Sequence, residues 1–115
     1  MEITKTLIIP LKEETLEVIN ILEQFLNNLK EDTELLVVLD SEKDSTHKIL
    51  KKSNLNITIL INDLGPGVSK AINYAIQKSK GRYICVAMGD GSDDPTQVEE
   101  LLLLVQRGLS VAVAS

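Results

Sequence analysis

The sequence is poor in residues that several kinds of functional site require. It has one cysteine, Cys85, which cannot form an internal disulfide and has no C-x-x-C partner for zinc or redox chemistry. Because Cys85 lies inside an apolar run, we expect a buried thiol and not a nucleophile. The one histidine, His47, lies in a lysine-rich segment, so neither a Ser–His–Asp nor a Cys–His arrangement can be assembled.

Two longer features are also missing. No segment gathers the 12 Lys and Arg residues into a basic stripe, and the formal net charge is -5, so we expect no nucleic-acid partner. The longest apolar run is only a handful of residues, far below the roughly 20 that span a bilayer. The segment from Met1 to Thr6 is polar and charged, unlike a signal peptide. We expect a cytoplasmic chain, with any membrane association supplied by sequence outside it.

The composition indicates one globular domain over residues 1–115. Apolar residues make up 43% and charged residues 25% of the chain, which is ordinary for a folded protein and argues against disorder. A chain of 115 residues is long enough for one core and too short for two.

Short β-branched apolar runs alternate with segments of helical period, a pattern typical of a parallel α/β fold. Strands are predicted at Thr6–Ile9, Glu34–Leu39, Asn56–Ile61, Tyr83–Met88 and Leu109–Ala114. Helices are predicted at Glu13–Lys30, Asp44–Lys52, Val68–Ser79 (ended by Gly81) and Pro95–Arg107. Right-handed crossovers with helices on both faces predict a three-layer sandwich with strand order 3-2-1-4 plus a fifth strand.

This strand order predicts where a ligand binds. The chain reverses direction across the sheet between the first and fourth strands, and ligands of open α/β sheets lie at such a point, beyond the carboxyl ends of the strands. The flanking loops are Pro10–Glu14 and Gly89–Asp94, and the second is the most acidic loop of the chain.

Three aspartates in that acidic loop, Asp90, Asp93 and Asp94, suit a hard cation. Magnesium takes one or two carboxylates together with substrate phosphates, and Gly89 and Gly91 allow the backbone to approach a ligand closely. In the alternative interpretation Asp93 and Asp94 cap the following helix, whereas Asp90 lies too early to do so. The loop therefore indicates a site for a divalent cation, and Asp90 is the aspartate that helix capping explains least.

Two other loops could contact an anionic ligand. Gly65-Pro66-Gly67 precedes a helix whose first turn carries Lys70, and free N–H groups at a helix start favour phosphate. A plain turn with a solvated lysine explains this loop equally well, and the P-loop pattern is absent. Asp40 follows the second strand, where a carboxylate can accept from a ribose or base, whereas Asp44 fits a helix cap better.

Five short segments follow one another in an order that, taken together, is typical of a known protein family. They are Ile9-Pro10 with Glu13-Glu14, Val37–Thr46, Gly65–Gly67, Lys80–Ile84 and Met88–Pro95. Over Lys5 to Ser115 this order resembles the N-terminal, nucleotide-binding half of family 2 glycosyltransferases with the GT-A fold. The closest resemblance is to the dolichol-phosphate-mannose-synthase-like branch, whose members transfer a sugar from a nucleotide to a polyprenyl phosphate.

The resemblance implies a role for seven residues. Those that contact the nucleotide sugar are Pro10, Leu11, Glu14, Asp40, Gly67, Lys70 and Asp90. The first three match a loop that contacts base and ribose, Asp40 matches an acid that contacts the nucleotide, and Gly67 with Lys70 flanks the donor. Asp90 matches the last acid of a D-x-D motif, which holds the cation that bridges the diphosphate. The resemblance thus implies Mg2+ or Mn2+ held by Asp90, with Asp93 as a second ligand.

The chain also departs from the family pattern. Met88 replaces the first acid of D-x-D, Leu39 replaces one of two acids after the second strand, and Lys12-Glu13 replaces a Tyr-Asn pair. In the family a later strand lies between the fourth and fifth, so here the fourth strand must be paired differently. Because the chain ends at Ser115, we expect the acceptor site, for a lipid phosphate or glycan, to come from a partner chain or a second copy, and assign no catalytic base.

Three other functions were weighed against a glycosyltransferase. A non-catalytic nucleotide-binding or regulatory domain has the same features without transfer activity. A response-regulator-like domain needs an acidic pair after the first strand, an Asp after the third and a Lys after the fifth. Here the third strand ends in Ile61-Asn62-Asp63, and the fifth carries no Lys at its end. A nucleotidyltransferase needs a Gly-rich basic loop after the first strand, which Pro10-Leu11-Lys12-Glu13 does not provide.

Overall fold

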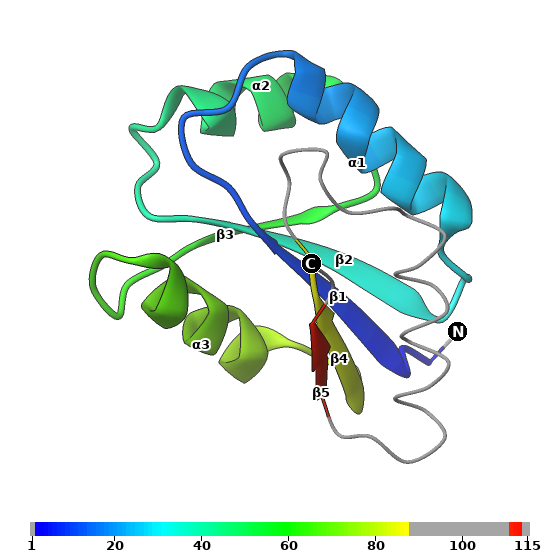
Figure 1. Ribbon diagram of the computed structural model, residues 1–115. Coiled ribbons are helices and arrows are strands. Elements are labelled where there is room, and N and C mark those ends of the chain that lie inside the picture. Colours follow the sequence, from blue (N-terminus) through cyan, green and yellow to red (C-terminus); the bar gives the residue numbers. More distant parts are fainter. Residues whose placement is uncertain (1, 88–110, 114–115) are drawn as a thin grey trace.

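The computed structural model describes residues 2–87 and 111–113, which form a parallel α/β sandwich. Its elements are β1 (Lys5–Pro10), α1 (Glu17–Asn28), β2 (Thr33–Leu39), α2 (Ser45–Ser53), β3 (Thr58–Ile61), α3 (Val68–Lys78), β4 (Tyr83–Val86) and β5 (Val111–Val113). The alternation of strands and helices predicted from the sequence is confirmed for these elements (Figure 1). The predicted helix Pro95–Arg107 lies outside the described residues.

The sheet has the order β3-β2-β1-β4-β5, and every neighbouring pair is parallel. The predicted order 3-2-1-4 with a fifth strand is therefore confirmed. β1 is central: Lys5 is in register with Thr33 of β2 on one side and with Tyr83 of β4 on the other. The outer edge of β4 pairs directly with β5, so that Ile84 lies opposite Val111.

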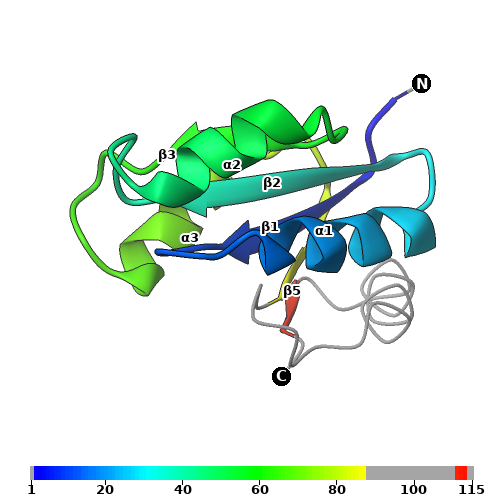
Figure 2. The same cartoon turned by 90° about the horizontal axis from the view of Figure 1, so that it is seen from above.

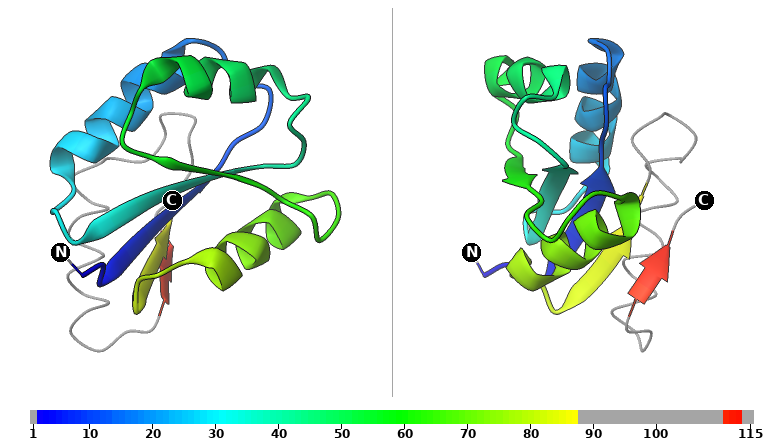
Figure 3. Two further views of the ribbon diagram at one scale, coloured as in Figure 1. Left: turned by 180° about the vertical axis from the view of Figure 1, so that it is seen from behind. Right: turned by 90° about the vertical axis from the view of Figure 1, so that its left-hand side faces the viewer.

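Helices cover both faces of this sheet. α1 and α2 lie side by side on one face, as the view from above shows (Figure 2), and α3 lies on the other (Figure 3). Alternate residues of β1 divide between the two layers: Leu7 and Ile9 belong to the core under α1 and α2, and Ile8 belongs to the core under α3. This alternation is why the strands are apolar on both faces.

Helix α1 attaches to the sheet through a regularly spaced apolar face. Val18, Leu22 and Phe25 are at most 1% exposed, and their spacing of four and three places them on one side of a helix. Each such side chain stabilises the fold by about 1.5–3 kcal/mol when it is fully buried. Among the described residues no helix is both long enough and apolar enough to cross a membrane.

The predicted start of the first helix was wrong. We expected it at Glu13, with Glu13 and Glu14 in the first turn, but α1 begins at Glu17. Glu13 has a φ of 49°, which a right-handed helix does not allow. The N–H groups of Glu13 and Glu14 instead donate to Asp44 and Thr46, which lie about thirty residues further along the chain. Local sequence cannot show that competition.

Gly81 also has a different role from the predicted one. Helix α3 ends at Lys78 with Ser79 as its C-cap, so Gly81 does not end it. Gly81 instead lies against β1: its N–H donates to Thr6 Oγ1 at 2.9 Å. A Cβ atom at Gly81 would lie 2.5 Å from the carbonyl carbon of Lys5 and 2.7 Å from the backbone nitrogen of Thr6. Only glycine allows the chain to enter β4 this close to β1.

Substituting Gly81→Ala is therefore expected to lower the free energy of unfolding by about 3 kcal/mol, because backbone atoms cannot move aside as a side chain can. Urea denaturation followed by circular dichroism measures the difference. Lys80→Ala is the control, since this exposed side chain can be removed while the Lys80 N–H still donates to Glu34. A Gly81→Ala protein as stable as Lys80→Ala contradicts the close approach.

Candidate functional site

The loops that follow β1, β2 and β3 leave the sheet at the same edge, because carboxyl ends of parallel strands face one way. The loops after β2 and β3 lie on the left in Figure 1. Side chains from these loops hydrogen-bond to backbone and side-chain groups of neighbouring loops in two networks, one centred on Asp44 and one centred on Asn62.

The first network ties the loop after β1 to the start of α2. Asp44 is the N-cap of α2, as predicted, and its Oδ1 accepts from the N–H of Thr46 at 2.9 Å. The same carboxylate accepts from the N–H of Glu13, at 3.0 Å to Oδ2 and 3.2 Å to Oδ1. The Glu14 N–H donates to Oγ1 of Thr46 at 2.7 Å, and Thr46 is fully buried. The loop that leads into α1 is thus held against α2.

These contacts also lower the pKa of Asp44. Partial burial alone would raise it, but the N–H groups of Glu13 and Thr46, the Thr46 hydroxyl and the charge of Lys12 together outweigh burial and hold the pKa of Asp44 below its ordinary value. The ionised carboxylate is the form that accepts these hydrogen bonds. The network is therefore complete only while Asp44 is charged.

The second network joins the loops after β2 and β3. The Asn62 side chain is 7% exposed, and its Nδ2 donates to Asp40 Oδ1 at 3.0 Å and to the Gly65 carbonyl at 2.7 Å. Its Oδ1 accepts from the Leu64 N–H at 2.9 Å. Asp40 Oδ2 meets the Gly67 N–H at 3.4 Å, close to the limit for a hydrogen bond.

The start of α3 is suited to an anion. Its N-cap is Gly67, which has no side chain to occupy the free N–H groups, and its first turn contains no acidic residue. Gly65 and Gly67 have φ values of 118° and 113°, which side chains other than glycine rarely allow. The Lys70 side chain folds back over this loop: a Cβ atom on Gly65 would lie 3.1 Å from Lys70 Nζ. The positive end of the helix dipole and the charge of Lys70 therefore both contribute positive potential at the start of α3.

Comparison with protein families shows which family the chain belongs to. The family described as glycosyl transferase family 2 matches residues 6–115, which is nearly the whole chain. The chain belongs to this family. A search of curated proteins finds no match. Membership of this family implies that the domain binds a nucleotide-sugar donor. The loops described above lie at the carboxyl edge, that is, at the end of the sheet where the carboxyl ends of β1, β2 and β3 lie.

Most donor-binding residues predicted for the glycosyltransferase come together at this edge. Pro10 ends β1, Asp40 follows β2, and Gly67 and Lys70 begin α3. Leu11 is 5% exposed, its side chain belongs to the core under α1, and its N–H donates to the Val38 carbonyl at 3.0 Å. Any contact of Leu11 with a donor therefore involves its backbone. Glu14 is half-buried beside Thr46.

The predicted metal ligands cannot be compared in the same way. Asp90 and Asp93, like Met88 and Asp94, lie outside the described residues. Within residues 2–87 and 111–113, no three His, Cys, Asp or Glu side chains form a group that could hold a metal ion. The metal site of the glycosyltransferase thus stays a prediction that concerns the loop after β4.

Two residues of the networks were missed as functional candidates. Asn62 directly follows β3 and precedes Gly65-Pro66-Gly67, and an asparagine in that position often organises a turn through its own side chain. That signal was available. Thr46 gave no comparable signal, because a threonine in the first turn of a helix is ordinary. Its partner Glu14 can be identified only from the fold.

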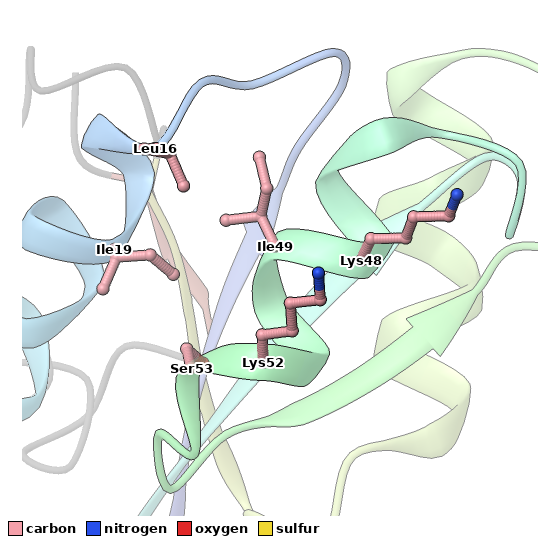
Figure 4. Close-up of a pocket in the computed structure, with 6 residues that line it drawn as sticks. All are labelled: Leu16, Ile19, Lys48, Ile49, Lys52 and Ser53. Atoms are coloured by element: carbon pink, nitrogen blue, oxygen red, sulfur yellow. The ribbon is translucent and has the colours of Figure 1, made fainter.

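A cavity of about 330 Å³ lies elsewhere in the glycosyltransferase, between α1 and α2. Figure 4 shows apolar side chains of both helices facing one another, with the ammonium groups of two lysines on the α2 side. Its lining residues are Leu16, Ile19, Lys48, Ile49, Lys52 and Ser53. This cavity shares no residue with the networks at the carboxyl edge, so we do not assign the donor to it.

Removing the Asp44 carboxylate tests the first network. Asp44→Ala is expected to lower the free energy of unfolding at neutral pH by about 1–2 kcal/mol, as for a lost helix cap. The folded-state pKa of Asp44 is depressed, so its contribution is present above the unfolded-state pKa near 4 and is lost as pH falls through the folded-state value.

Denaturation curves at neutral pH and near pH 2.5 should therefore show the gap between wild type and Asp44→Ala shrinking in acid. Glu42→Ala, which removes an exposed carboxylate from the same loop, serves as the control. A gap that is the same at both pH values would show that the charge of Asp44 does not hold the loop.

Proposed function

We propose that this glycosyltransferase binds a nucleotide-diphospho-sugar across the carboxyl edge of the sheet through a divalent cation, and transfers the sugar to a polyprenyl phosphate. The observation that supports it most is the convergence of Asp40, Gly67 and Lys70, which come from two segments, the loop after β2 and the start of α3, and meet around Asn62. A carboxylate for hydroxyl groups and a cationic helix start for phosphate are the two recognition elements that a nucleotide diphosphate needs.

The nucleoside end is assigned to the side of Asp40. A carboxylate at the end of the second strand accepts hydrogen bonds from ribose hydroxyls in many nucleotide-binding sheets. Oδ1 of Asp40 accepts from Asn62, whereas within residues 2–87 the one hydrogen bond to Oδ2 is the long contact with Gly67, so Oδ2 has capacity for a ribose hydroxyl. Pro10 lies in register with Val38 of the adjacent strand, which brings the loop after β1 beside Asp40.

The diphosphate is assigned to the start of α3. Backbone N–H groups after Gly67 and the Nζ atom of Lys70 provide donors and positive charge at one place. A lysine in the first turn of a helix opposes the helix dipole, and a bound anion removes that conflict. The chain as a whole is acidic, so a positive charge concentrated at the start of α3 favours an anionic ligand there.

The cation is assigned to Asp90, with Asp93 as a second ligand. Ala87 donates its N–H to the Ile8 carbonyl at 2.9 Å, so the chain leaves β4 beside the carboxyl end of β1. The described chain thus reaches this edge three residues before Asp90 in the sequence, which supports the assignment. Carboxylate oxygens suit Mg2+ or Mn2+, and such an ion, when bound, neutralises charge that develops on a departing diphosphate.

The acceptor class follows from the resemblance of the ordered segments to the dolichol-phosphate-mannose-synthase-like branch. A phosphate oxygen of the acceptor attacks the anomeric carbon, the bond from that carbon to the nucleotide diphosphate breaks, and the configuration inverts. An ionised phosphate is already a nucleophile, so the step needs no general base. We propose that the chain meets such a lipid acceptor at the cytoplasmic surface of a membrane.

Titration of UDP- and GDP-sugars by calorimetry, with and without Mn2+, tests this function. We expect one nucleotide sugar to bind at least about tenfold more tightly with Mn2+. Asp90→Asn should remove the metal-dependent part of the affinity and leave the fold intact, while Asp63→Asn, which removes an exposed carboxylate from the loop after β3, should change little. Binding that ignores the metal in the wild type would contradict the role of Asp90.

Lys70→Gln tests the diphosphate assignment separately. We expect the affinity for a nucleoside diphosphate to fall about tenfold, the loss of one charge-assisted hydrogen bond, and the affinity for the nucleoside alone to stay the same. Lys78→Gln, which removes a lysine from the last turn of the same helix, is the matched control. Equal losses for nucleoside and diphosphate would place the phosphates elsewhere.

A further inference from the structure

Asn62 is a buried polar side chain at the carboxyl edge whose donors and acceptor are all in use, and the donor contacts proposed above do not involve it. Its amide donates to Asp40 Oδ1 and to the Gly65 carbonyl and accepts from the Leu64 N–H, while its backbone N–H donates to the Leu39 carbonyl at 2.7 Å. A buried amide with donors and acceptor all in use is held in one orientation.

We propose that Asn62 is a positioning residue for the nucleotide: it orients the Asp40 carboxylate and holds the Gly65–Gly67 loop at the distance that a nucleotide diphosphate spans. This inference rests on the proposed function, because it assigns Asp40 to the nucleoside and the Gly67 helix start to the phosphates. Asn62 itself does not contact the donor.

The geometry shows how one amide acts on both ends of the ligand. Its Nδ2 donor occupies one oxygen of Asp40, which leaves Oδ2 as the oxygen available to a hydroxyl group. The same nitrogen holds the Gly65 carbonyl at 2.7 Å, at the residue over which the Lys70 side chain folds. A change at Asn62 therefore moves the carboxylate and the phosphate-binding loop together.

The chemistry explains why the position needs an amide. Aspartate has nearly the same shape, but as a carboxylate it cannot donate, so it would place negative charge against Asp40 and against the Gly65 carbonyl. Serine is too short to reach Asp40, yet its hydroxyl can still accept from the Leu64 N–H and support the turn. Both substitutions keep the acceptor for the Leu64 N–H and remove the donor to Asp40, so they separate the effect of the turn from the effect of the contact with Asp40.

Asn62→Asp gives the sharpest test, because protonation restores a donor. At pH 7.5 two adjacent carboxylates repel, and we expect the affinity for the nucleotide sugar that the wild type prefers to fall about 30-fold in the presence of Mn2+. Like charges raise the pKa of such a pair, so near pH 5 one shared proton lets residue 62 donate to Asp40, and the loss should shrink to about threefold.

The other charged groups near residue 62 and Asp40 are the same in the wild type and in the Asn62→Asp protein. Lys70 folds over Gly65, and Asp63 is exposed on the same loop, so the wild type measured at each pH corrects for their effects. The diphosphate of a nucleotide sugar is fully esterified and does not titrate in this range. Asn62→Ser should bind about tenfold more weakly than the wild type at both pH values, since serine cannot regain a donor to Asp40.

Urea denaturation of each variant accompanies the titrations, so that only folded protein is compared. Wild-type affinity at pH 7.5 in a folded Asn62→Asp protein overturns the positioning role, and so does a loss that does not recover in acid. If the wild type itself binds no nucleotide sugar, the proposed function fails and not this inference alone. If the wild type binds a nucleotide sugar and both Asn62→Asp and Asn62→Ser bind it with the same affinity as the wild type, only the inference fails.

Discussion

Parallel pairing of β1 with β2 on one side and β4 on the other is the constraint on which the rest of the structure depends. Lys5 lies opposite both Thr33 and Tyr83, and the buried residues from Leu7 to Ile9 supply core to both helical layers. Strands on both sides of β1 bring loops that are distant in sequence to one edge. The close approach of Gly81 to β1 is part of the same constraint, because β4 cannot reach its register otherwise.

The loops at that edge are connected by side chains as well as by the sheet. Asp44 holds the loop after β1 against α2, and Asn62 holds the loop after β2 against the start of α3. A family 2 glycosyltransferase must hold a long, charged donor in one orientation, and loops that are already bonded to one another lose less entropy when the donor binds. Both networks thus connect the fold with the proposed function.

The sequence predicted the fold well because hydrophobic periodicity is local. The strand order followed from the right-handedness of the crossover connections. Asp44 was recognised as the N-cap of α2. The start of α1 was not predictable, since the N–H groups of Glu13 and Glu14 bind partners about thirty residues away. In the site, Asp40, Gly67 and Lys70 were named from the sequence as donor contacts, and the fold places them at one edge of the sheet. The sequence marked Asn62 as a turn residue, but its bond to Asp40 is visible only in the fold. Asp90 and Asp93 remain predictions from the resemblance.

Amide chemical-shift mapping tests most directly whether the carboxyl edge is the donor site. In a ¹⁵N spectrum titrated with a nucleotide sugar and Mg2+, we predict shifts at residues of the three bonded loops, among them Asp40, Asn62 and Gly67, and at Asp90 and Asp93, with Mn2+ broadening the same signals. Shifts that gather instead at Leu16, Ile49 and Lys52, around the cavity between α1 and α2, would contradict the account.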